Sequence, residues 1–434
     1  MTETKSNPWA LLPLFIFLAL FIGSGVITGD FYKLPVVVAI LIASAVALVM
    51  NRKDSLTVKM ERFAKGAGHP DIMIMVFIYI LAGAFAETAK GMGAVESTVN
   101  LALTVIPQNL LIVGLFVIGV FISLAMGTSM GTITALAPIG VGISHQIDVN
   151  IALCMAAIVG GAMFGDNLSV ISDTTIAAVR TQKTKMTDKF KMNFLIVLPA
   201  AIITCVILFF VASGSNAPID VKDYNWIKII PYIGVLVAAL FGLNVLVILS
   251  AGIVLAGGIG LVDGSYTVSS LFQKMTAGIF GMSELIILAL LIGGMVELIN
   301  HNGGIKYLLD ALTRKIRSPK GAQLGIAGLV SATDLATANN TISIITVGPL
   351  AKKISDQYGI DNRKSASILD IFACSMQGLI PYGAQLLTVA KFASISPISV
   401  LPYSFYPILI AICGLISIFV GYPRLKPSTN KNGI

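Results

Sequence analysis

The sequence predicts an all-α membrane protein that crosses the bilayer several times. Of its 434 residues, 56% are hydrophobic and only 12% are charged, whereas soluble domains carry roughly 25% charged residues. The apolar residues form long blocks, and about 20 consecutive apolar residues span the hydrocarbon core as one helix. Backbone polar groups in lipid must be paired internally, which leaves helices or closed barrels. The short alternating segments of barrel strands are absent from the sequence.

The first apolar block runs from about Pro8 to Thr28. It is longer than the roughly 7–15 residues of a signal-peptide core, so it is predicted to be a retained transmembrane helix. Loops rich in Lys and Arg face the cytoplasm, and here they are residues 51–70, 180–191, 306–320, 352–364 and the C-terminal tail. Loops poor in both, placed outside, are residues 93–108, 213–225 and 394–401. We therefore expect both termini in the cytoplasm.

An internal repeat relates residues 85–175 to residues 295–390. Glu87 lies six residues before Gly93, and Glu297 lies six residues before Gly303. Two further pairs of segments match at a similar offset, 125–140 with 336–351 and 160–175 with 375–390. The loop charges give the two copies opposite directions across the membrane. The sequence therefore predicts inverted-topology repeats, an arrangement typical of alternating-access transporters.

Each repeat is predicted to contain a re-entrant hairpin. Residues 322–334 and 338–351 are each too short to cross the bilayer, and basic flanks indicate entry from the cytoplasm. The corresponding hairpin around Gly127–Gly131 is expected to open to the outside. The chain then divides into an N-terminal hairpin and loop, a first repeat, connecting helices, a second repeat, and a last helix with its tail: 1–70, 71–192, 193–278, 279–393 and 394–434.

Each repeat is also predicted to contain a broken helix, interrupted near Gly165–Asn167 and near Gly378–Gly383. An ionisable group in the bilayer costs at least about 2.5–3.5 kcal/mol, so a cluster of polar groups there indicates function. The run GDNLSVISDTT supplies carboxylate, amide and hydroxyl oxygens, which suit an alkali cation beside unwound backbone. The predicted ion-binding residues, with Na⁺ held by the two aspartates, are Asp166, Asn167, Ser169, Asp173 and Thr174. In the alternative, both aspartates cap helices near the cytoplasmic surface.

The hairpin turns carry the second polar cluster. One turn lies in SATDLATANNTIS and the other in GTSMGT. Amide side chains accept and donate hydrogen bonds, and glycines allow a backbone to approach a ligand closely. The predicted substrate-contacting residues are Gly127, Thr128, Ser129, Asp334, Thr337, Asn339 and Asn340. A polar turn satisfied by its own backbone is the alternative.

Single carboxylates at equivalent points of the repeats, Glu87 and Glu297, are candidate proton carriers. They are equally compatible with helix ends that meet interfacial water. His301 lies one turn after Glu297 and could share its helix face, although a single interfacial histidine is the simpler interpretation. Asp370 is interpreted as the N-terminal charge of a helix that follows a basic loop.

Several function classes are disfavoured by what the sequence lacks. It contains no GxxxxGK[ST] phosphate loop, no HExxH motif and no dinucleotide fingerprint after a strand. We therefore expect no enzyme and no cofactor beyond a coupling ion, Na⁺ or H⁺ or both. The net charge of +8 lies in loops between apolar blocks, so nucleic acid is not an expected partner. The expected partners are membrane lipid and a small-molecule or ion substrate, and a homodimer is possible.

The segment from Gly161 to Gln182 resembles the signature of the NhaC-type Na⁺/H⁺ antiporter family. With the basic run DKFKMN that follows, it is similar to a small subgroup that includes suspected amino-acid permeases. The resemblance implies a bacterial inner-membrane carrier that uses sodium or protons. It favours a Na⁺/H⁺ antiporter and leaves open a Na⁺- or H⁺-coupled permease for a small amino acid, with histidine a candidate, or for an organic acid.

Overall fold

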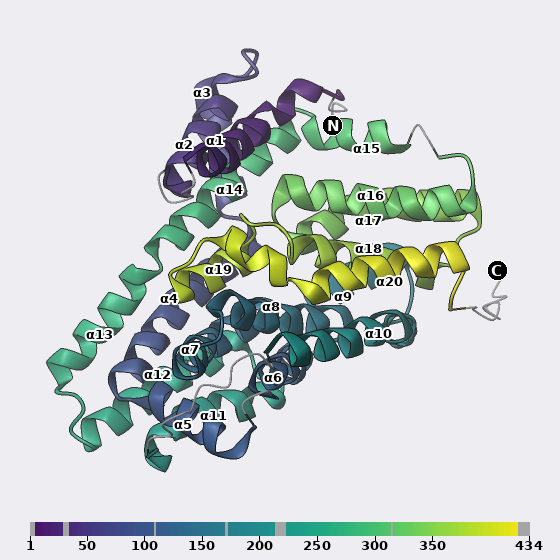
Figure 1. Ribbon diagram of the computed structural model, residues 1–434. Coiled ribbons are helices and arrows are strands. Elements are labelled where there is room, and N and C mark those ends of the chain that lie inside the picture. The colour runs from purple at the N-terminus through teal and green to yellow at the C-terminus, as the bar shows by residue number, and fades with distance from the viewer. Residues whose placement is uncertain are drawn as a thin grey trace.

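The computed structural model describes residues 5–28, 34–107, 110–169, 172–212, 223–313 and 316–423. All regular elements among these residues are helices (Figure 1), which confirms the predicted all-α class. Five helical segments are long and apolar enough to cross a membrane, or six if one strongly bent pair forms a single span. The predicted C-terminal tail and most of the predicted loop 213–225 lie outside the described residues.

The chain begins with the 3₁₀ helix η1 (Pro8–Leu11). The helices up to residue 212 are α1 (Leu12–Thr28), α2 (Val36–Val49), α3 (Leu56–Ala67), α4 (Pro70–Gly91), α5 (Ala94–Val105), α6 (Leu111–Met126), α7 (Ser129–Ile147), α8 (Ile151–Leu168), α9 (Asp173–Gln182) and α10 (Met186–Ala212). Those that follow are α11 (Trp226–Leu240), α12 (Val245–Val262), α13 (Val268–Gly281), α14 (Ser283–His301), α15 (Gly304–Thr313), α16 (Pro319–Thr337), α17 (Asn340–Tyr358), α18 (Asn362–Gln377), α19 (Ala384–Ala393), the 3₁₀ helix η3 (Pro397–Tyr403) and α20 (Phe405–Val420).

Three segments predicted as loops contain most or all of an α-helix, and in residues 306–320 this helix is α15. α3 lies within residues 51–70 and begins at the N-cap Ser55, whose hydroxyl accepts a hydrogen bond from the N–H of Val58. α5 lies within residues 93–108. Charged residues interrupt an apolar block without ending helix formation, because one helix face can still pack against a neighbour. Loop limits taken from hydropathy and charge were therefore wrong at all three places.

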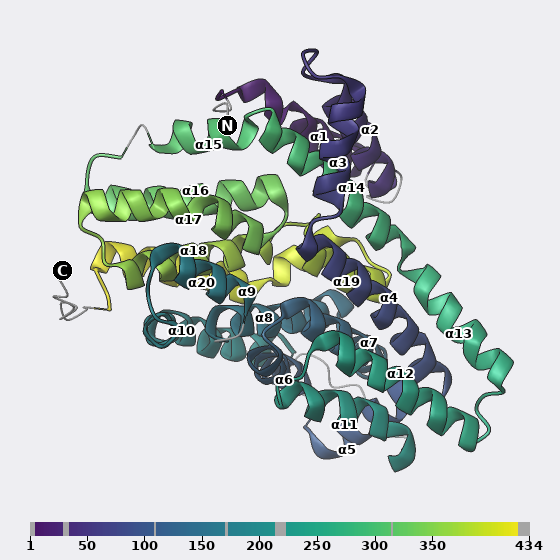
Figure 2. The same cartoon turned by 180° about the vertical axis from the view of Figure 1, so that it is seen from behind.

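Two long helices, α4 and α14, each pack against helices from a distant part of the chain. α4 contacts α12 and α13, while α14 contacts α2 and α3. The two groups lie at opposite ends of the molecule (Figures 1 and 2). Both crossings depend on glycine. A Cβ added to Gly66 would lie 2.3 Å from the carbonyl oxygen of Gly293, and one added to Gly83 would lie 2.2 Å from that of Gly278.

Two helical hairpins end in tight polar turns. The C-cap residues that follow α6 and α16 are Gly127 and Ala338, and both adopt left-handed backbone conformations, with φ of 68° and 49°. The next residue in each turn, Thr128 or Asn339, caps the following helix by accepting a hydrogen bond from a first-turn N–H. The two helices of the second hairpin have 19 residues each, longer than predicted. Figures 1 and 2 show α16 and α17 lying side by side.

The two helix breaks lie opposite these turns. α18 ends at Gln377 and α19 begins at Ala384, which matches the gap predicted between Gly378 and Gly383. α8 continues to Leu168, so the break predicted at Gly165–Asn167 was placed too early. Gly165 lies inside the helix because α6 packs closely there: a Cβ on it would lie 2.1 Å from the Ser123 hydroxyl oxygen.

This packing gives a first prediction. We expect Gly165→Ala to lower the free energy of unfolding by about 1–3 kcal/mol, since overpacking a tight interior forces side chains and backbone to shift. Thermal unfolding in detergent measures the loss. Gly258→Ala is the matched control, because a Cβ there meets nothing within 4 Å. Equal melting temperatures for the two variants would contradict the prediction.

Candidate ion-binding site

A cavity of about 80 Å³ lies where the two hairpin turns meet the two helix breaks and the first turns of α4. Its size suits a few water molecules or a small ion. The polar residues that line it are Asp71, Thr128, Ser129, Asp166, Ser172, Asp173, Thr174, Asn339, Asn340, Thr341, Gln377 and Gln385. Segments that are more than 200 residues apart in the chain therefore form one polar chamber.

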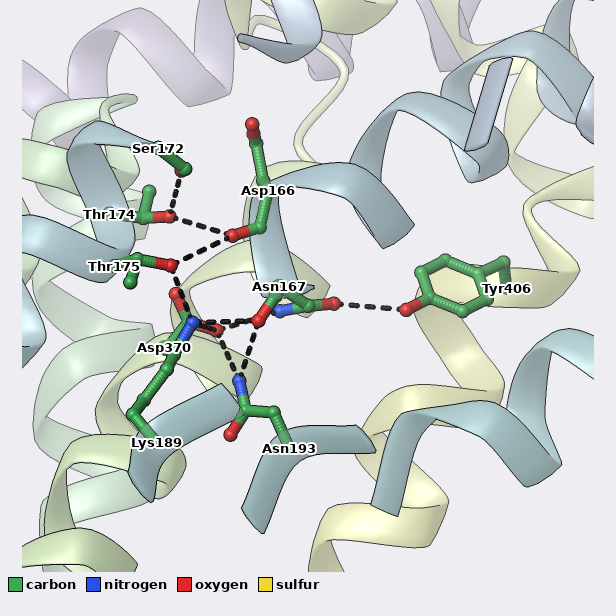
Figure 3. A network of polar contacts seen from close by, with 9 residues as sticks. All are labelled: Asp166, Asn167, Ser172, Thr174, Thr175, Lys189, Asn193, Asp370 and Tyr406. Atoms are coloured by element: carbon green, nitrogen blue, oxygen red, sulfur yellow. Dashed lines mark hydrogen bonds and ion pairs between the residues drawn. The ribbon is translucent and has the colours of Figure 1, made fainter. Parts of the chain in front are cut away.

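Asp166 is the buried carboxylate of this cavity. It lies two residues before the end of α8 and is 4% exposed. Its Oδ1 accepts a hydrogen bond of 3.0 Å from the backbone N–H of Ser129, which joins α8 to the α6–α7 turn. Its backbone oxygen accepts from the hydroxyls of Thr174 and Thr175, while its side chain points away from them (Figure 3). Asp166 is therefore not a surface helix cap.

Two further carboxylates lie at a more open part of the cavity wall. Asp173 is the first residue of α9 and is exposed. Asp71 lies in the first turn of α4, where its side chain is 29% exposed. With Asp166 they place three acidic side chains around one small polar space. Such a concentration of one charge sign attracts cations and raises their local concentration.

Two buried glutamines connect the hairpin turns. The side-chain Nε2 of Gln377 donates to Gln385 Oε1 at 2.6 Å and to the backbone oxygen of Ala338 at 3.2 Å. Gln385 Nε2 in turn donates to the hydroxyl of Ser129 at 3.3 Å. The Oε1 atom of Gln377 is buried and accepts no hydrogen bond from the residues that the structure describes. A buried acceptor without a protein donor is free to accept from a water molecule or to bind an ion.

A second polar network lies behind Asp166, beside the first helix break. Asp370 Oδ2 accepts hydrogen bonds from Lys189 Nζ at 2.9 Å, Asn193 Nδ2 at 2.7 Å and Asn167 Nδ2 at 3.1 Å. Lys189 also donates to the backbone oxygen of Asn167 at 2.7 Å, and Tyr406 donates to its side-chain oxygen at 3.0 Å. All five side chains are almost fully buried. Figure 3 shows them converging from α8, α10, α18 and α20.

This network corrects two sequence interpretations. Lys189 was placed in a basic cytoplasmic loop, but α10 already begins at Met186 and turns Lys189 inward. Asp370 was interpreted as a helix N-terminal charge, but α18 begins at Asn362 and places it in the helix interior. Each charge is tolerated only because the other one is present. No local pattern could show a partner that lies 181 residues away.

The structure gathers most of the predicted site residues in the cavity. Those that line it are Asp166, Asp173, Thr174, Gly127, Thr128, Ser129, Asn339 and Asn340. The side chain of Asn167 points instead to the Asp370 network, and the Ser169 hydroxyl donates to the backbone oxygen of Leu124. Thr337 lines a small neighbouring apolar cavity, and Asp334 is buried in α16. Neither glutamine was predicted as a site residue, because an uncharged amide in an apolar stretch gives no charge signal.

The two candidate proton carriers lie elsewhere. Glu87 lines a separate cavity of about 560 Å³ between α4, α5, α7 and α13. Glu297 lies 3.7 Å from Lys65 Nζ. The His301 ring is 2.9 Å from Asp54, so it pairs with the α2–α3 loop and not with Glu297.

The sequence model of the Na⁺/H⁺ antiporter family matches this chain twice, over residues 6–213 and 211–422. The chain belongs to the Na⁺/H⁺ antiporter family. This membership confirms the resemblance seen in the segment from Gly161 to Gln182. The two matches meet between α10 and α11.

Curated relatives cover nearly the whole chain. The Na⁺/H⁺ antiporter NhaC of Bacillus subtilis is 27% identical over 82% of this chain and 84% of its own. The malate-2H⁺/Na⁺-lactate antiporter of the same organism is 22% identical over 95% of each chain. NhaC of Alkalihalophilus pseudofirmus is 22% identical over the full length of both. Among solved structures, the YdaH transporter of Alcanivorax borkumensis aligns with a TM-score of 0.44 and 15% identity, covering 96% of this chain and 99% of its own.

Proposed function

We propose that this protein is a secondary active antiporter that exchanges Na⁺ for H⁺ at the Asp166 cavity. The observation that carries the proposal is the Asp166 carboxylate, buried at 4% exposure and fixed by the N–H of Ser129. A buried carboxylate is stable only when its charge is neutralised. A proton and Na⁺ can each do so, but not both at once. Exchange follows when the cavity can turn from one side of the membrane to the other with either Na⁺ or a proton bound.

The cavity offers several oxygen ligands for the cation. Asp166 and Gln377, whose Oε1 is unpaired among the described residues, both line the cavity, and the hydroxyls of Thr128 and Ser129 lie in the first hairpin turn. Oxygen-rich sites with irregular backbone are the sites that transporters use for Na⁺ and H⁺. A volume of about 80 Å³ favours an ion with few waters over an amino acid. This favours the antiporter over the permease alternative.

We further propose that α1–α10 and α11–α20 are inverted repeats around this site. The double family match supports the division. So does the order of elements, because each half contains a hairpin with a left-handed turn followed by a helix that breaks. The contacts between the halves are also reciprocal: α3 of the first half packs on α14 of the second, and α13 of the second packs on α4 of the first. In this arrangement both hairpins are re-entrant, and the segments 71–192 and 279–393 form the transport cores.

The charge distribution supports a placement in the membrane. With the basic loops inside, the protein lies in a bacterial inner membrane with both termini in the cytoplasm. The mouth of the cavity at Asp71 and Asp173 then faces the cytoplasm, because Asp71 follows the basic segment 51–70. The protein is surrounded by membrane lipid, and the coupling ion is its only cofactor. A homodimer would give the moving helices a fixed scaffold.

Gln377 provides a test of the ligand set. We expect Gln377→Leu to raise the apparent Kd for Na⁺ by about 10–100-fold, because a ligand bond to a charged group contributes roughly 1.5–3 kcal/mol. Sodium titration of the purified protein by calorimetry measures the change. Gln273→Leu, on α13 and outside the cavity, is the matched control. Unchanged Na⁺ affinity in Gln377→Leu would remove this side chain from the site.

Transport in proteoliposomes tests the function itself. A pH gradient, acid inside, should drive uptake of radioactive Na⁺ with no other solute present. The same vesicles are then given a panel of labelled amino acids and organic acids under Na⁺ and pH gradients. Accumulation of an amino acid that collapses without the gradients, together with no Na⁺ flux in its absence, would establish the permease instead.

A further inference from the structure

Asp334 is a buried carboxyl group outside the proposed Na⁺ site. It lies in the last turn of α16, where its backbone oxygen accepts the N–H of the turn residue Ala338 at 2.7 Å. Its side chain is 0% exposed, and neither carboxyl oxygen has a hydrogen-bond partner among the described residues. It does not line the cavity that contains Asp166.

The first hairpin shows what belongs at this position. Ser123 of α6 also lies four residues before a left-handed turn residue, since its backbone oxygen accepts the N–H of Gly127 at 2.9 Å. Its buried hydroxyl donates a 2.7 Å hydrogen bond to the backbone oxygen of Ala162 in α8. α16 packs on α18 as α6 packs on α8. In the first hairpin this position therefore holds a neutral hydroxyl and no charge, and the carboxyl group of Asp334 is neutral only when it is protonated.

The charges around Asp334 also indicate that its carboxyl group is protonated. The buried cation Lys189 is bound to Asp370 on α18, and the hydroxyl of Tyr382 donates to the backbone oxygen of Leu335 at 2.6 Å. No salt bridge to Asp334 occurs among the described residues. A buried ionised carboxylate without a partner is strongly unfavourable. The neutral acid avoids that penalty.

We propose that Asp334 holds a proton in this conformation and is a second proton-carrying site, separate from the Na⁺ site. When the α16–α17 turn moves away from α18, water enters between them. The carboxyl O–H bond then breaks and the proton passes to water. The proton returns when the two elements pack again. Its role in coupling rests on the proposed antiport, whereas its protonation does not.

Infrared spectroscopy of the purified protein at neutral pH tests the protonation directly. The absorption of a protonated carboxyl should be lost from the spectrum of Asp334→Asn and of Asp334→Ser, the residue of the first hairpin. Asp356→Asn is the control, since that side chain is 61% exposed and pairs with Lys352. An unchanged absorption in both Asp334 variants would overturn the proposal. Unfolding of both would do so too, because Asn and Ser replace a neutral acid with little loss.

Flux measurements then test the carrier role. In proteoliposomes, Asp334→Asn should keep Na⁺ binding and lose one proton per transport cycle relative to the wild type. An unchanged ratio of protons to Na⁺ would refute the carrier role while leaving Na⁺/H⁺ exchange at Asp166 intact. If the wild type exchanges no Na⁺ for protons, the proposed function fails. The infrared result still decides whether Asp334 holds a proton.

Discussion

Asp166→Asn should reduce proton-driven Na⁺ flux by about 100-fold or more. Asparagine has nearly the same shape, and its side-chain oxygen can still accept the N–H of Ser129 that Asp166 accepts. It can neither carry a proton nor neutralise a cation, and the loss of a charged partner in a buried site costs roughly 3–5 kcal/mol. Radioactive Na⁺ uptake into proteoliposomes under a pH gradient measures the loss. Circular dichroism should show an unchanged helix content.

The neighbouring carboxylate provides a graded comparison. Asp173 is exposed at the mouth of the same cavity, where water screens its charge. We expect Asp173→Asn to weaken Na⁺ uptake by only a few-fold through a higher apparent KM, since an exposed charge contributes roughly 1 kcal/mol or less. Equal losses in the two variants would show that both aspartates bind the ion directly. Full activity in Asp166→Asn would refute the site.

Lys189→Gln should lower the free energy of unfolding by about 3–5 kcal/mol, the usual cost of breaking a buried ion pair. The substitution leaves the Asp370 carboxylate inside the protein with amide donors but no cation. Asp370→Asn should cost a similar amount, because it leaves the ammonium group unpaired. Thermal unfolding in detergent, followed by circular dichroism, measures both losses.

A double variant separates the pair from its parts. Lys189→Met combined with Asp370→Leu removes both charges, and we expect it to be more stable than either single variant. Lys352→Gln is the control, since its partner Asp356 is 61% exposed and such pairs contribute about 1 kcal/mol or less. If Lys189→Gln melts like this control, the network does not hold α8, α10 and α18 together.

Local sequence patterns were sufficient for the fold class and for many of the residues that line the cavity. Long apolar blocks required membrane-spanning helices, and polar residues within them had few explanations other than a site. Asp166 was found in this way because ionisable groups are costly at that depth. The turn residues Thr128 and Asn339 were found because polar runs between short apolar segments indicate hairpin turns, where amide and hydroxyl groups can contact a ligand.

Features that depend on contacts between distant segments were not predictable from one sequence. Lys189 appeared to be a loop charge because its partner lies on α18, and Gln377 appeared to be an ordinary polar residue because its unpaired oxygen is visible only in three dimensions. Gly165 suggested a helix break when its role is to admit Ser123 of α6. Residue types indicate that a segment has a structural or functional role, whereas its contacts with distant segments determine which role that is.

Competition between Na⁺ and a proton at Asp166 is most directly tested by the protons released when Na⁺ binds. Purified protein in weakly buffered detergent solution is titrated with NaCl, with choline chloride as the control for ionic strength, while a pH electrode records the release. The proposed mechanism predicts proton release that saturates with Na⁺ in the wild type and is absent in Asp166→Asn. Sodium binding without proton release, or the same release from Asp166→Asn, would contradict it.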